Sequence, residues 1–586
     1  MRQWMVAAKK ADFYAIAEKF HVDPVVARII RNREVIGEKN IRIYLGGNLS
    51  DLSDPHQMKD MDRLVEILAQ KIRKQVHIRI IGDYDVDGVT SSHLFLTALR
   101  RVGAKVDVVI PHRIQDGYGL SLHLLQQAKE DGVDTILTCD NGIAAIDEIA
   151  WAKAQKMTVL VTDHHAVPFE EHEGRRTEKK SLADAVVNPH QQDCGYPYKE
   201  LCGAGVAWNV IRVLYENYDM DKREAEDLLD FVAMATVCDV MSLTGENRIL
   251  VKEGLKRIRH TKNIGLQALM QACNVQPENI SAYHFGYVLG PCVNATGRLD
   301  TARHALRLFE TGQETEAEEI ARDLVDLNQE RKELTLQGVE MAKKLCEEGG
   351  YEKDPVLVLF LPDVHESIAG LIAGRIREMY NRPVFVLTRG EEGVKGSGRS
   401  TENYSMYENM CGCAELFTKF GGHPMAAGLS LPEENVEKFR RKINENCPLT
   451  VEEVCPDIHI DMAMPVGYAS TELVHQFALL EPFGKDNPSP LFADRNLSIS
   501  RMWVIGKNRN VLRMSVLSEY GQPVPVIFFG DVETLFAYFT EKFGQKEVEN
   551  ALHGRKNRIL FSMVYTAKID FYQGNENLQL EMKYYR

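Results

Sequence analysis

The 586-residue sequence lacks the features of secreted and membrane-spanning proteins. No apolar run approaches the roughly 18 residues that a membrane-spanning helix needs. Residues 1–20 are charged and amphipathic, without the apolar stretch or small-residue cleavage site of a signal peptide. The eleven cysteines are scattered and include no Cys-x-x-Cys pair, which favours reduced thiols over a disulfide framework. These absences predict a cytoplasmic protein with no membrane partner.

Positive charge is also scarce, because 70 Lys and Arg residues face 84 Asp and Glu residues, for a net charge of −14. This balance excludes a protein that coats nucleic acid over its whole surface, but it allows a local basic groove and suits an acidic metal site. The Gly-x-Ser-x-Gly motif of serine hydrolases is absent. The length predicts three or four domains.

The chain is organised around three alternating carboxylates, Asp83, Asp85 and Asp87, followed by Gly88. They follow an apolar strand expected over residues 76–81. Side chains in an extended segment alternate with period two, so all three carboxylates can face one way. Converging carboxylates form an oxygen-rich site for Mg²⁺ or Mn²⁺. The alternative is a solvated acidic loop that caps the next helix.

Residues 76–190 alternate between short apolar strands and helices, which predicts a mostly parallel sheet covered on both faces. The strands are expected at 76–81, 106–110, 134–138, 158–162 and 185–187. Open sheets of this kind bind ligands at the carboxyl ends of their strands.

Acids and imidazoles follow two further strands of this predicted sheet. Asp140 follows the third strand, and Asp163, His164 and His165 follow the fourth. Asp239 ends an apolar helix, where the helix dipole disfavours a carboxylate unless a cation lies nearby. A local hydrogen bond to the backbone is the alternative for Asp239. Three separate segments therefore bring metal-binding groups to one edge.

A second α/β unit is expected from residue 355, after a long helical stretch over 303–347 that bridges two domains. Its glycine-rich segments, 396–400 and 420–428, carry Arg399 and His423. Glycines let backbone N–H groups approach an anion, and a guanidinium matches phosphate geometry. A glycine-rich turn without function is the alternative.

Short β-like runs dominate residues 456–586, and a barrel of about five strands with one helix, as in the OB-fold, is the economical interpretation. An aromatic residue lies among basic ones there, which suits single-stranded nucleic acid. These residues are Trp503, Lys507, Arg509 and Arg513. A surface hairpin is the alternative.

The ordered set Asp83-x-Asp85-x-Asp87-Gly88, Asp140, Asp163-His164-His165 and Asp239 resembles the DHH phosphoesterase superfamily. Residues 397–400 and 421–423 resemble its C-terminal substrate-binding domain, DHHA1. The similarity is fullest to the RecJ family of bacterial single-strand-specific exonucleases, through residues 111–113, 117–120, 294–299, 481–484 and 487–488. Asn141, where His is frequent, and Thr296, where a small residue is usual, depart from the family pattern.

The resemblance implies an α/β fold class with a parallel-sheet DHH domain, a long helix, a second smaller α/β (DHHA1) domain and an OB-like β-barrel. The expected boundaries are a lead-in segment at 1–50, the DHH domain at 51–300, the connecting helix at 301–350, the DHHA1 domain at 351–450 and the barrel at 456–586.

The resemblance also assigns roles to residues. Two ions, Mn²⁺ or Mg²⁺, would be held by Asp85, Asp87, Asp140, His164 and Asp239, with Asp140 bridging. Asp83 and Asp163 would orient these ligands, and His165 would lie near the scissile phosphate. The implied substrate-binding residues are Arg113, Tyr118, Asn294, Arg298, Ser397, Arg399 and His423. Arg113, Ser397 and Arg399 among them would hold a 5′-terminal phosphate.

The implied function is 5′→3′ hydrolysis of single-stranded DNA to mononucleotides in recombination and repair, by two-metal phosphodiester hydrolysis. The implied partners are single-stranded DNA with a 5′-phosphate, a single-strand-binding protein and a helicase. One alternative is a DHH-family phosphodiesterase or nucleotidase that acts on short oligonucleotides or small phosphates. Another is a catalytically dead replication scaffold, which should have lost metal ligands.

Overall fold

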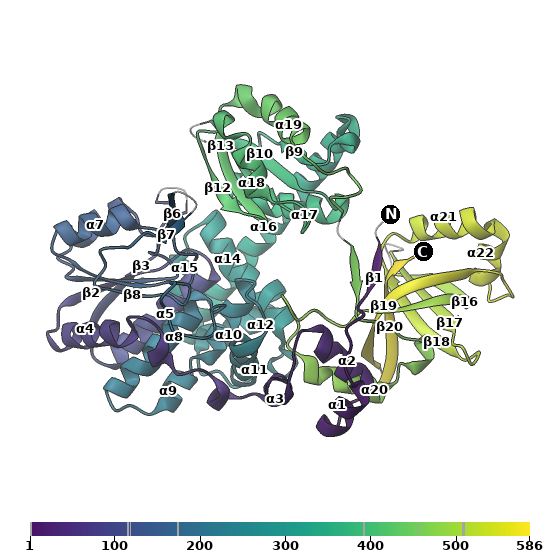
Figure 1. Ribbon diagram of the computed structural model, residues 1–586, viewed down its shortest axis with the longest axis horizontal. Coiled ribbons are helices and arrows are strands. Elements are labelled where there is room, and N and C mark those ends of the chain that lie inside the picture. The colour runs from purple at the N-terminus through teal and green to yellow at the C-terminus, as the bar shows by residue number, and fades with distance from the viewer. Residues whose placement is uncertain are drawn as a thin grey trace. The chain divides into compact units, whose positions relative to one another are not determined.

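The computed structural model describes residues 3–113, 116–117, 119–172, 175–390, 393–455, 457–506, 510–572 and 574–586. The chain forms two compact units (Figure 1). The first consists mainly of Leu52–Met241 and Glu246–Pro456, and the second of Gln3–Asp51, Ser242–Gly245 and Asp457–Arg586. Within the described ranges, every helix is too short or too polar to cross a lipid bilayer.

The first unit begins with a five-stranded parallel sheet of order β3-β2-β4-β5-β8. Its strands are β2 (His77–Ile81), β3 (Lys105–Val109), β4 (Thr135–Cys139), β5 (Thr158–Thr162) and β8 (Ala185–Val187). A hairpin of β6 (Phe169–His172) and β7 (Arg175–Glu178), which the sequence pattern did not predict, precedes β8.

Helices cover both faces of this sheet, because its strands are apolar on both sides. Helices α6 (Leu122–Glu130) and α7 (Ile146–Ala154) share one hydrophobic cluster with Ile136, Val159 and Val161. The helices that contact the sheet without joining that cluster are α4 (Met61–Arg73), α5 (Val86–Arg101) and α8 (Gly203–Asn217).

A helical region follows the sheet and ends in a long helix. The helices are α9 (Lys222–Glu226), α10 (Leu229–Cys238), α11 (Gly245–Ile258), α12 (Ile264–Ala272), α13 (Ala282–His284), α14 (Gly290–Leu299), α15 (Arg303–Glu310) and α16 (Glu314–Glu348). A π-helix, Phe285–Leu289, joins α13 to α14. The stretch expected as one helix over 303–347 is therefore divided into α15 and the 35-residue α16.

The second sheet of this unit has the order β12-β13-β11-β10-β9. Strands β9 (Leu357–Phe360) and β10 (Val384–Gly390) are parallel, whereas β11 (Gly393–Arg399), β12 (Lys419–His423) and β13 (Ala426–Leu431) add antiparallel pairs. Helices α16 and α17 (Glu366–Tyr380) pack through one hydrophobic cluster, and α18 (Met406–Cys411) and α19 (Val436–Glu445) through another. The two glycine-rich segments, interpreted from sequence as turns or anion-binding loops, lie mainly in strands β11, β12 and β13.

The second unit is built on a closed barrel, in which β16-β17-β18-β20-β19 are neighbours and β19 also pairs with β16. Its strands are β15 (Met462–Ala463), β16 (Phe492–Ile505), β17 (Val511–Leu517), β18 (Pro523–Phe529), β19 (Leu560–Tyr572) and β20 (Asn575–Tyr585). Its helices are α20 (Thr471–Phe477), α21 (Val532–Phe543) and α22 (Gln545–Leu552).

The N-terminal residues belong to this barrel unit. Strand β1 (Trp4–Val6) pairs in parallel with β14 (Ile458–Ile460), some 450 residues later in the chain. Helices α1 (Phe13–Phe20), α2 (Pro24–Asn32) and α3 (Glu38–Gly46) contribute buried side chains to the barrel's hydrophobic core. Arg33 and Asp461 add a bidentate ion pair, with N–O distances of 2.8 and 3.2 Å.

Candidate functional site

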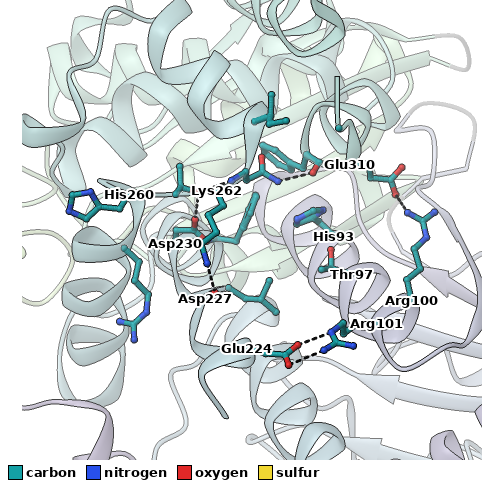
Figure 2. Close-up of a pocket in the computed structure, with 18 of the residues that line it drawn as sticks. His93, Thr97, Arg100, Arg101, Glu224, Asp227, Asp230, His260, Lys262 and Glu310 are labelled. Carbon is teal, nitrogen blue, oxygen red and sulfur yellow. Dashed lines mark hydrogen bonds and ion pairs between the residues drawn. The ribbon is translucent and has the colours of Figure 1, made fainter. Parts of the chain in front are cut away.

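The first unit contains a cavity of about 1070 Å³ that is not lined by any residue singled out from the sequence (Figure 2). Its charged lining residues pair with one another: Arg101 donates two hydrogen bonds to Glu224, and Lys262 lies 3.3 Å from Asp227. His93 is buried at this cavity, and burial together with the charge of Arg100 lowers the pKa of His93 to about 3. The predicted site residues gather instead at the opposite end of α5.

The three alternating aspartates lie between β2 and α5, as their sequence position predicts. Asp85 caps α5, and its carboxylate accepts a hydrogen bond from the N–H of Gly88 at 3.0 Å. Asp87 is buried, and its two oxygens accept hydrogen bonds from the N–H groups of Gly203 (2.6 Å) and Ala204 (2.8 Å). These N–H groups belong to the first turn of α8, where unpaired donors favour a carboxylate. The contact fixes the orientation of Asp87.

Asp140 follows β4 in a left-handed conformation with φ of 61°, which Asp adopts more readily than most residues. Gly203 approaches it so closely that a Cβ at position 203 would lie 2.6 Å from the Cβ of Asp140. Its neighbour Asn141 donates hydrogen bonds to the carbonyls of Ile81 (3.0 Å) and Cys139 (2.9 Å). Asn141, the departure from the family pattern, thus ties the ends of β2 and β4 together.

Asp163 orients the two histidines that follow it. Its carboxylate accepts hydrogen bonds from the N–H groups of His164 and His165 and lies 2.8 Å from Nδ1 of His165. A further N–H, that of Ile143, donates to its second oxygen at 2.9 Å. Although burial opposes ionisation, the hydrogen bond from His165 holds the pKa of Asp163 below its usual value.

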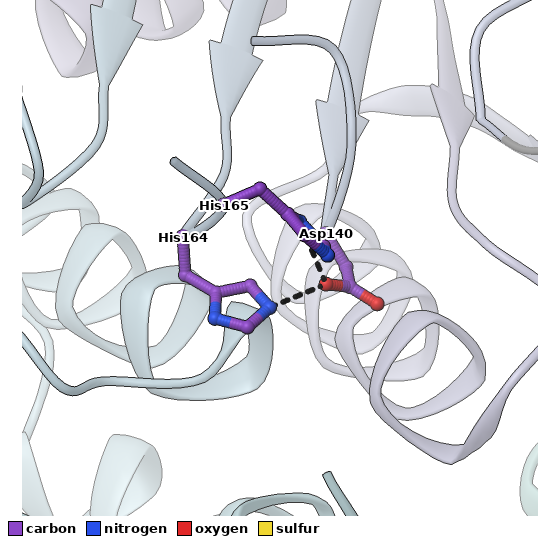
Figure 3. Close-up of side chains that lie close together, drawn as sticks. All are labelled: Asp140, His164 and His165. Atoms are coloured by element: carbon purple, nitrogen blue, oxygen red, sulfur yellow. Dashed lines mark ion pairs between the residues drawn. The ribbon is translucent and has the colours of Figure 1, made fainter. Parts of the chain in front are cut away.

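His164 lies among three carboxylates, two of which come from other segments of the first sheet's edge. Figure 3 shows one of them, Asp140, beside His164 and His165. Its Nε2 is 3.0 Å from Asp140, 3.7 Å from Asp87 and 3.6 Å from Asp239, the residue that ends α10. Burial and the neighbouring His165 lower the pKa of His164 to about 3. The ring is therefore neutral, and its nitrogen can serve as a metal ligand rather than as an ion-pair partner.

The electrostatics of these carboxylates favour the binding of a cation. Burial, and then the charge of Asp85, raise the pKa of Asp87 to about 6 and that of Asp83 well above its usual value. Burial and the neighbouring carboxylates, Asp87 first, do the same to the pKa of Asp140. For His165, burial opposes protonation, but the hydrogen bond and charge of Asp163 raise its pKa to about 9. A divalent cation would remove the repulsion between the carboxylates.

The donor geometry fits such a cation. The donor atoms form three sets, and within each set they lie within 4.8 Å of one another. The sets are Asp140 with His164 and His165, Asp87 with His164 and Asp239, and Asp83 with Asp85 and Asp140. Asp140 and His164 each belong to two of these sets. Carboxylate oxygens with one or two imidazoles suit Mn²⁺ or Mg²⁺. We refer to Asp83, Asp85, Asp87, Asp140 and Asp239 as the carboxylate cluster.

A second cavity, of about 500 Å³, adjoins the acidic loop and is lined by residues of both sheets' domains. We call it the arginine pocket because Arg113, Arg298 and Arg399 lie in or beside it. Tyr84 of the acidic loop lines it, with the Arg113 guanidinium 4.7 Å from the centre of the Tyr84 ring, and Ser397 lines it from β11. Lysines 395 and 419, which the sequence analysis did not single out, also line it.

The arginines repel one another. Burial, and then the charges of Arg113, Arg331 and Arg399, lower the pKa of Arg298 to about 10. Burial and the charges of Arg113 and Arg377 lower the pKa of Arg399. Both side chains are held by backbone carbonyls: Arg298 donates to Ser367 and Arg399 to Gly398, each at 2.7 Å. An anion is the natural partner for such a group.

The remaining predicted residues include two that the structure describes, Asn294 and His423, and three that it does not. Asn294, in α14, accepts a hydrogen bond from the N–H of Val86 at 3.2 Å and so supports the acidic loop. His423 is exposed at the end of β12, and Ala426 lies between it and Arg399 in the strand register. Tyr118, Lys507 and Arg509 lie outside the described residues.

The barrel carries the predicted aromatic residue beside basic ones. Trp503 of β16 is 38% exposed and is paired across the sheet with Arg513 of β17. The guanidinium of Arg501 lies 5.7 Å from the centre of the Trp503 ring. Arg501 was not predicted, although its alternation with Trp503 along one strand could have indicated it.

Gly203 and Ala204, which hold the Asp87 carboxylate, were also missed by sequence reasoning. No charged or catalytic side chain marks the first turn of α8. The small residues Gly203, Ala204 and Gly205 before an apolar helix are the available signal, because small residues permit a close approach to another segment.

Comparison with known proteins agrees with these features. Family models match for the DHH family, N-terminal domain (residues 77–236), the DHHA1 domain (353–447) and the RecJ OB domain (460–584). The single-stranded-DNA-specific exonuclease RecJ of Haemophilus influenzae is 32% identical over 582 residues, covering 96% of each chain. RecJ of Bacillus subtilis is 33% identical over 512 residues, and the match spans 87% of this chain but only 63% of that relative.

The crystal structure of RecJ in complex with Mn²⁺ from Thermus thermophilus is similar to the whole chain, with a TM-score of 0.81 at 25% identity, covering 79% of that chain. The expected fold class is confirmed: a parallel-sheet DHH domain and a DHHA1 domain are followed by an OB domain.

Proposed function

This chain belongs to the RecJ family of single-stranded-DNA-specific exonucleases, and we propose that it hydrolyses single-stranded DNA from the 5′ end to mononucleotides. The observation that carries this proposal is the contact between the carboxylate cluster and the arginine pocket. They meet at Tyr84, which lies between Asp83 and Asp85 in sequence and lines the pocket with Arg113 and Ser397. A hydrolytic site beside a pocket for a terminal phosphate would cleave at the end of a strand, which is the action of an exonuclease.

The residues that would hold two Mn²⁺ or Mg²⁺ ions are Asp85, Asp87, Asp140, His164 and Asp239. When bound, the ions would stabilise the attacking and leaving oxygens of an in-line displacement at phosphorus. Asp163 positions the two histidines through three hydrogen bonds and is itself held by the N–H of Ile143. Gly203 and Ala204 fix the Asp87 carboxylate. His165, hydrogen-bonded to Asp163, would donate to an oxygen of the scissile phosphate.

The direction of degradation follows from the arginine pocket. A terminal phosphate carries more charge and more free oxygens than an internal one, so a group of partly buried guanidinium cations would distinguish the two. Arg113, Ser397 and Arg399 would bind the 5′-phosphate, and Arg298 an oxygen of the same or the next phosphate. Strands with a 5′-phosphate would then be preferred.

The barrel would bind the part of the strand beyond the site, through stacking on Trp503 and phosphate contacts of Arg501 and Arg513. A nucleotidase for small phosphates has no use for such a surface, and a scaffold without activity has no need to keep the full ligand set. We further propose a role in DNA recombination and repair, with a single-strand-binding protein and a helicase as partners.

The test is degradation of single strands labelled at either end, with Mn²⁺, with Mg²⁺ and with chelator, while each end is blocked in turn. We expect metal-dependent release of mononucleotides that a blocked 5′ end prevents and a blocked 3′ end does not. Efficient cleavage of a dinucleotide with no action on long strands would instead support the nucleotidase alternative.

A further inference from the structure

Two cysteines lie in contact in the helical region of the first unit, outside the proposed site. The Sγ atoms of Cys273 and Cys292 are 3.7 Å apart. Cys273 ends α12 and is partly exposed, whereas Cys292 is buried in α14. The Sγ of Cys292 also donates to the carbonyl of Val288 and accepts from Nδ2 of Asn328, each at 3.3 Å. We call Cys273 and Cys292 the thiol pair.

The two members of the thiol pair are chemically different. The contact with the Cys292 sulfur lowers the pKa of Cys273, and despite partial burial the charge of Lys332 adds to this effect. Hydrogen bonding and burial raise the pKa of Cys292. The thiolate is the reactive form of cysteine, and reactive cysteines are partly exposed and lie near a cation. Cys273 therefore has the properties of an attacking thiol, and Cys292 those of a thiol that reacts second.

We propose that Cys273 and Cys292 form a reversible, peroxide-oxidised disulfide site. In the first step the Cys273 thiolate attacks one oxygen of hydrogen peroxide, forming an S–O bond as the O–O bond breaks, and hydroxide leaves. In the second, the Cys292 sulfur attacks the sulfenic acid at Cys273, forming the S–S bond as the S–O bond breaks. Peroxide gains two electrons, the two thiols lose two, and their protons leave in two molecules of water. A dithiol reductant reverses the change.

Closing this bond would pull Cys292, and with it α14, towards Cys273. The two sulfurs must approach from 3.7 Å to about 2.05 Å, and Cys292 must give up its proton and therefore its hydrogen bond to Val288. Helix α14 also carries Asn294, two residues after Cys292, which supports the acidic loop through Val86. The same helix carries Arg298, which belongs to the arginine pocket. Oxidation would thus displace groups on both sides of the proposed reaction site. This effect on activity, unlike the disulfide itself, rests on the proposed exonuclease function.

The test treats the full-length protein with hydrogen peroxide, blocks remaining thiols and identifies linked peptides by mass spectrometry before and after reduction. We expect a Cys273–Cys292 linked peptide, two hydrogens lighter than its parts, which reduction removes. The rate of single-strand degradation should fall by between about 10-fold and 100-fold, the scale of a 1 Å misplacement, and return on reduction.

Variants separate the possible outcomes. Cys273→Ser and Cys292→Ala should each keep their activity in peroxide, whereas Cys411→Ser, which changes an exposed cysteine elsewhere, should lose activity as the unmodified chain does. Absence of the linked peptide would overturn the site. A linked peptide with unchanged degradation would overturn its effect on activity. A chain inactive on DNA before oxidation would contradict the proposed function, while the linked peptide would still decide the disulfide.

Discussion

The carboxylate cluster and the three arginines of the arginine pocket are both groups of like charges, but only the carboxylates can lower their charge by binding protons. Burial and repulsion raise the pKa of Asp87 to about 6, so protons partly neutralise the cluster in mildly acidic solution. The same influences lower the pKa of Arg298 only to about 10, and its guanidinium stays charged at neutral pH. Protons would therefore compete with a cation at the cluster, whereas the arginines of the pocket keep their positive charge.

The two groups also differ in how they are built. The cluster is assembled mainly at the carboxyl ends of strands of one parallel sheet, with Asp239 added from the end of a helix. The arginine pocket takes Arg113 from the loop after β3, Arg298 from α14 and Arg399 from the second sheet. The cluster is thus fixed by one core, and the pocket by the packing of two.

The largest effect is expected from Asp140→Ala. Asp140 belongs to two of the three donor sets, so its loss should reduce hydrolysis by about 10³-fold or more, as removal of a principal catalytic group does. The melting temperature without metal should stay the same or rise, because a buried repelling carboxylate is removed. Asp323→Ala, which changes an exposed aspartate of α16, is the control. Near-normal turnover in Asp140→Ala would disprove the metal assignment.

Substitutions of Arg399 test the arginine pocket. Arg399→Ala should slow degradation of 5′-phosphorylated strands by roughly 10- to 100-fold and that of 5′-hydroxyl strands much less, because the guanidinium pairs with the terminal phosphate. Arg399→Lys should be intermediate, since it keeps the charge and loses the planar fork. The two strands, which differ only at that end, are compared in one kinetic series.

Arg322→Ala, at an exposed position of α16, should leave both rates unchanged. Equal losses on the two strands in Arg399→Ala would make this arginine a general backbone contact. Recognition of the 5′ end would then have to depend on Arg113.

Gly203→Ala should give a smaller effect on the carboxylate cluster. The added methyl group would lie 2.6 Å from the Cβ of Asp140, so Asp140 or α8 must shift. We expect a loss of about 1–3 kcal/mol in unfolding free energy, as for overpacked cores, and weaker metal binding. Gly312→Ala is the matched control, because a Cβ there meets nothing within 4 Å. Thermal melting with and without Mn²⁺ measures both effects, and a Gly203→Ala variant with unaltered melting and metal response would contradict this geometry.

Gly203 also illustrates what the sequence could predict. The acidic residues were found because carboxyl strand ends converge, a rule that needs only the order of strands and helices. The partner of Asp87 could not be found in this way, since Gly203 and Ala204 act through backbone N–H groups that carry no side-chain signal. The same limit applies to β11, β12 and β13, whose glycines resemble turns until their register is known.

Contacts between distant parts of the chain were the other omission. The pairing of β1 with β14 and the ion pair of Arg33 with Asp461 join segments more than 400 residues apart. Residues 1–50 were predicted only as a lead-in segment, without any indication of what they pack against. A truncation that removes only residues 457–586 would therefore expose apolar side chains of α2, such as Val26 and Ile29. A deletion that tests the barrel without exposing these side chains must remove residues 1–51 as well.

The smallest effect is expected from substitutions in the barrel. Its candidate binding surface has one aromatic residue and separated basic residues, unlike the closely grouped charges of the first unit. Trp503→Ala should weaken binding to a long single strand by about 1–3 kcal/mol with little change in salt dependence, because stacking releases no counterions. Trp503→Phe should keep most of the affinity. Arg513→Ala, at the position paired with Trp503, should instead reduce the slope of log affinity against log salt by about one. Fluorescence anisotropy with labelled strands across a salt series, in the presence of chelator, distinguishes the two signatures.

A steep change of salt slope in Trp503→Ala, or equal losses on a dinucleotide and a long strand, would argue that Trp503 supports the fold of β16 and β17 rather than a base.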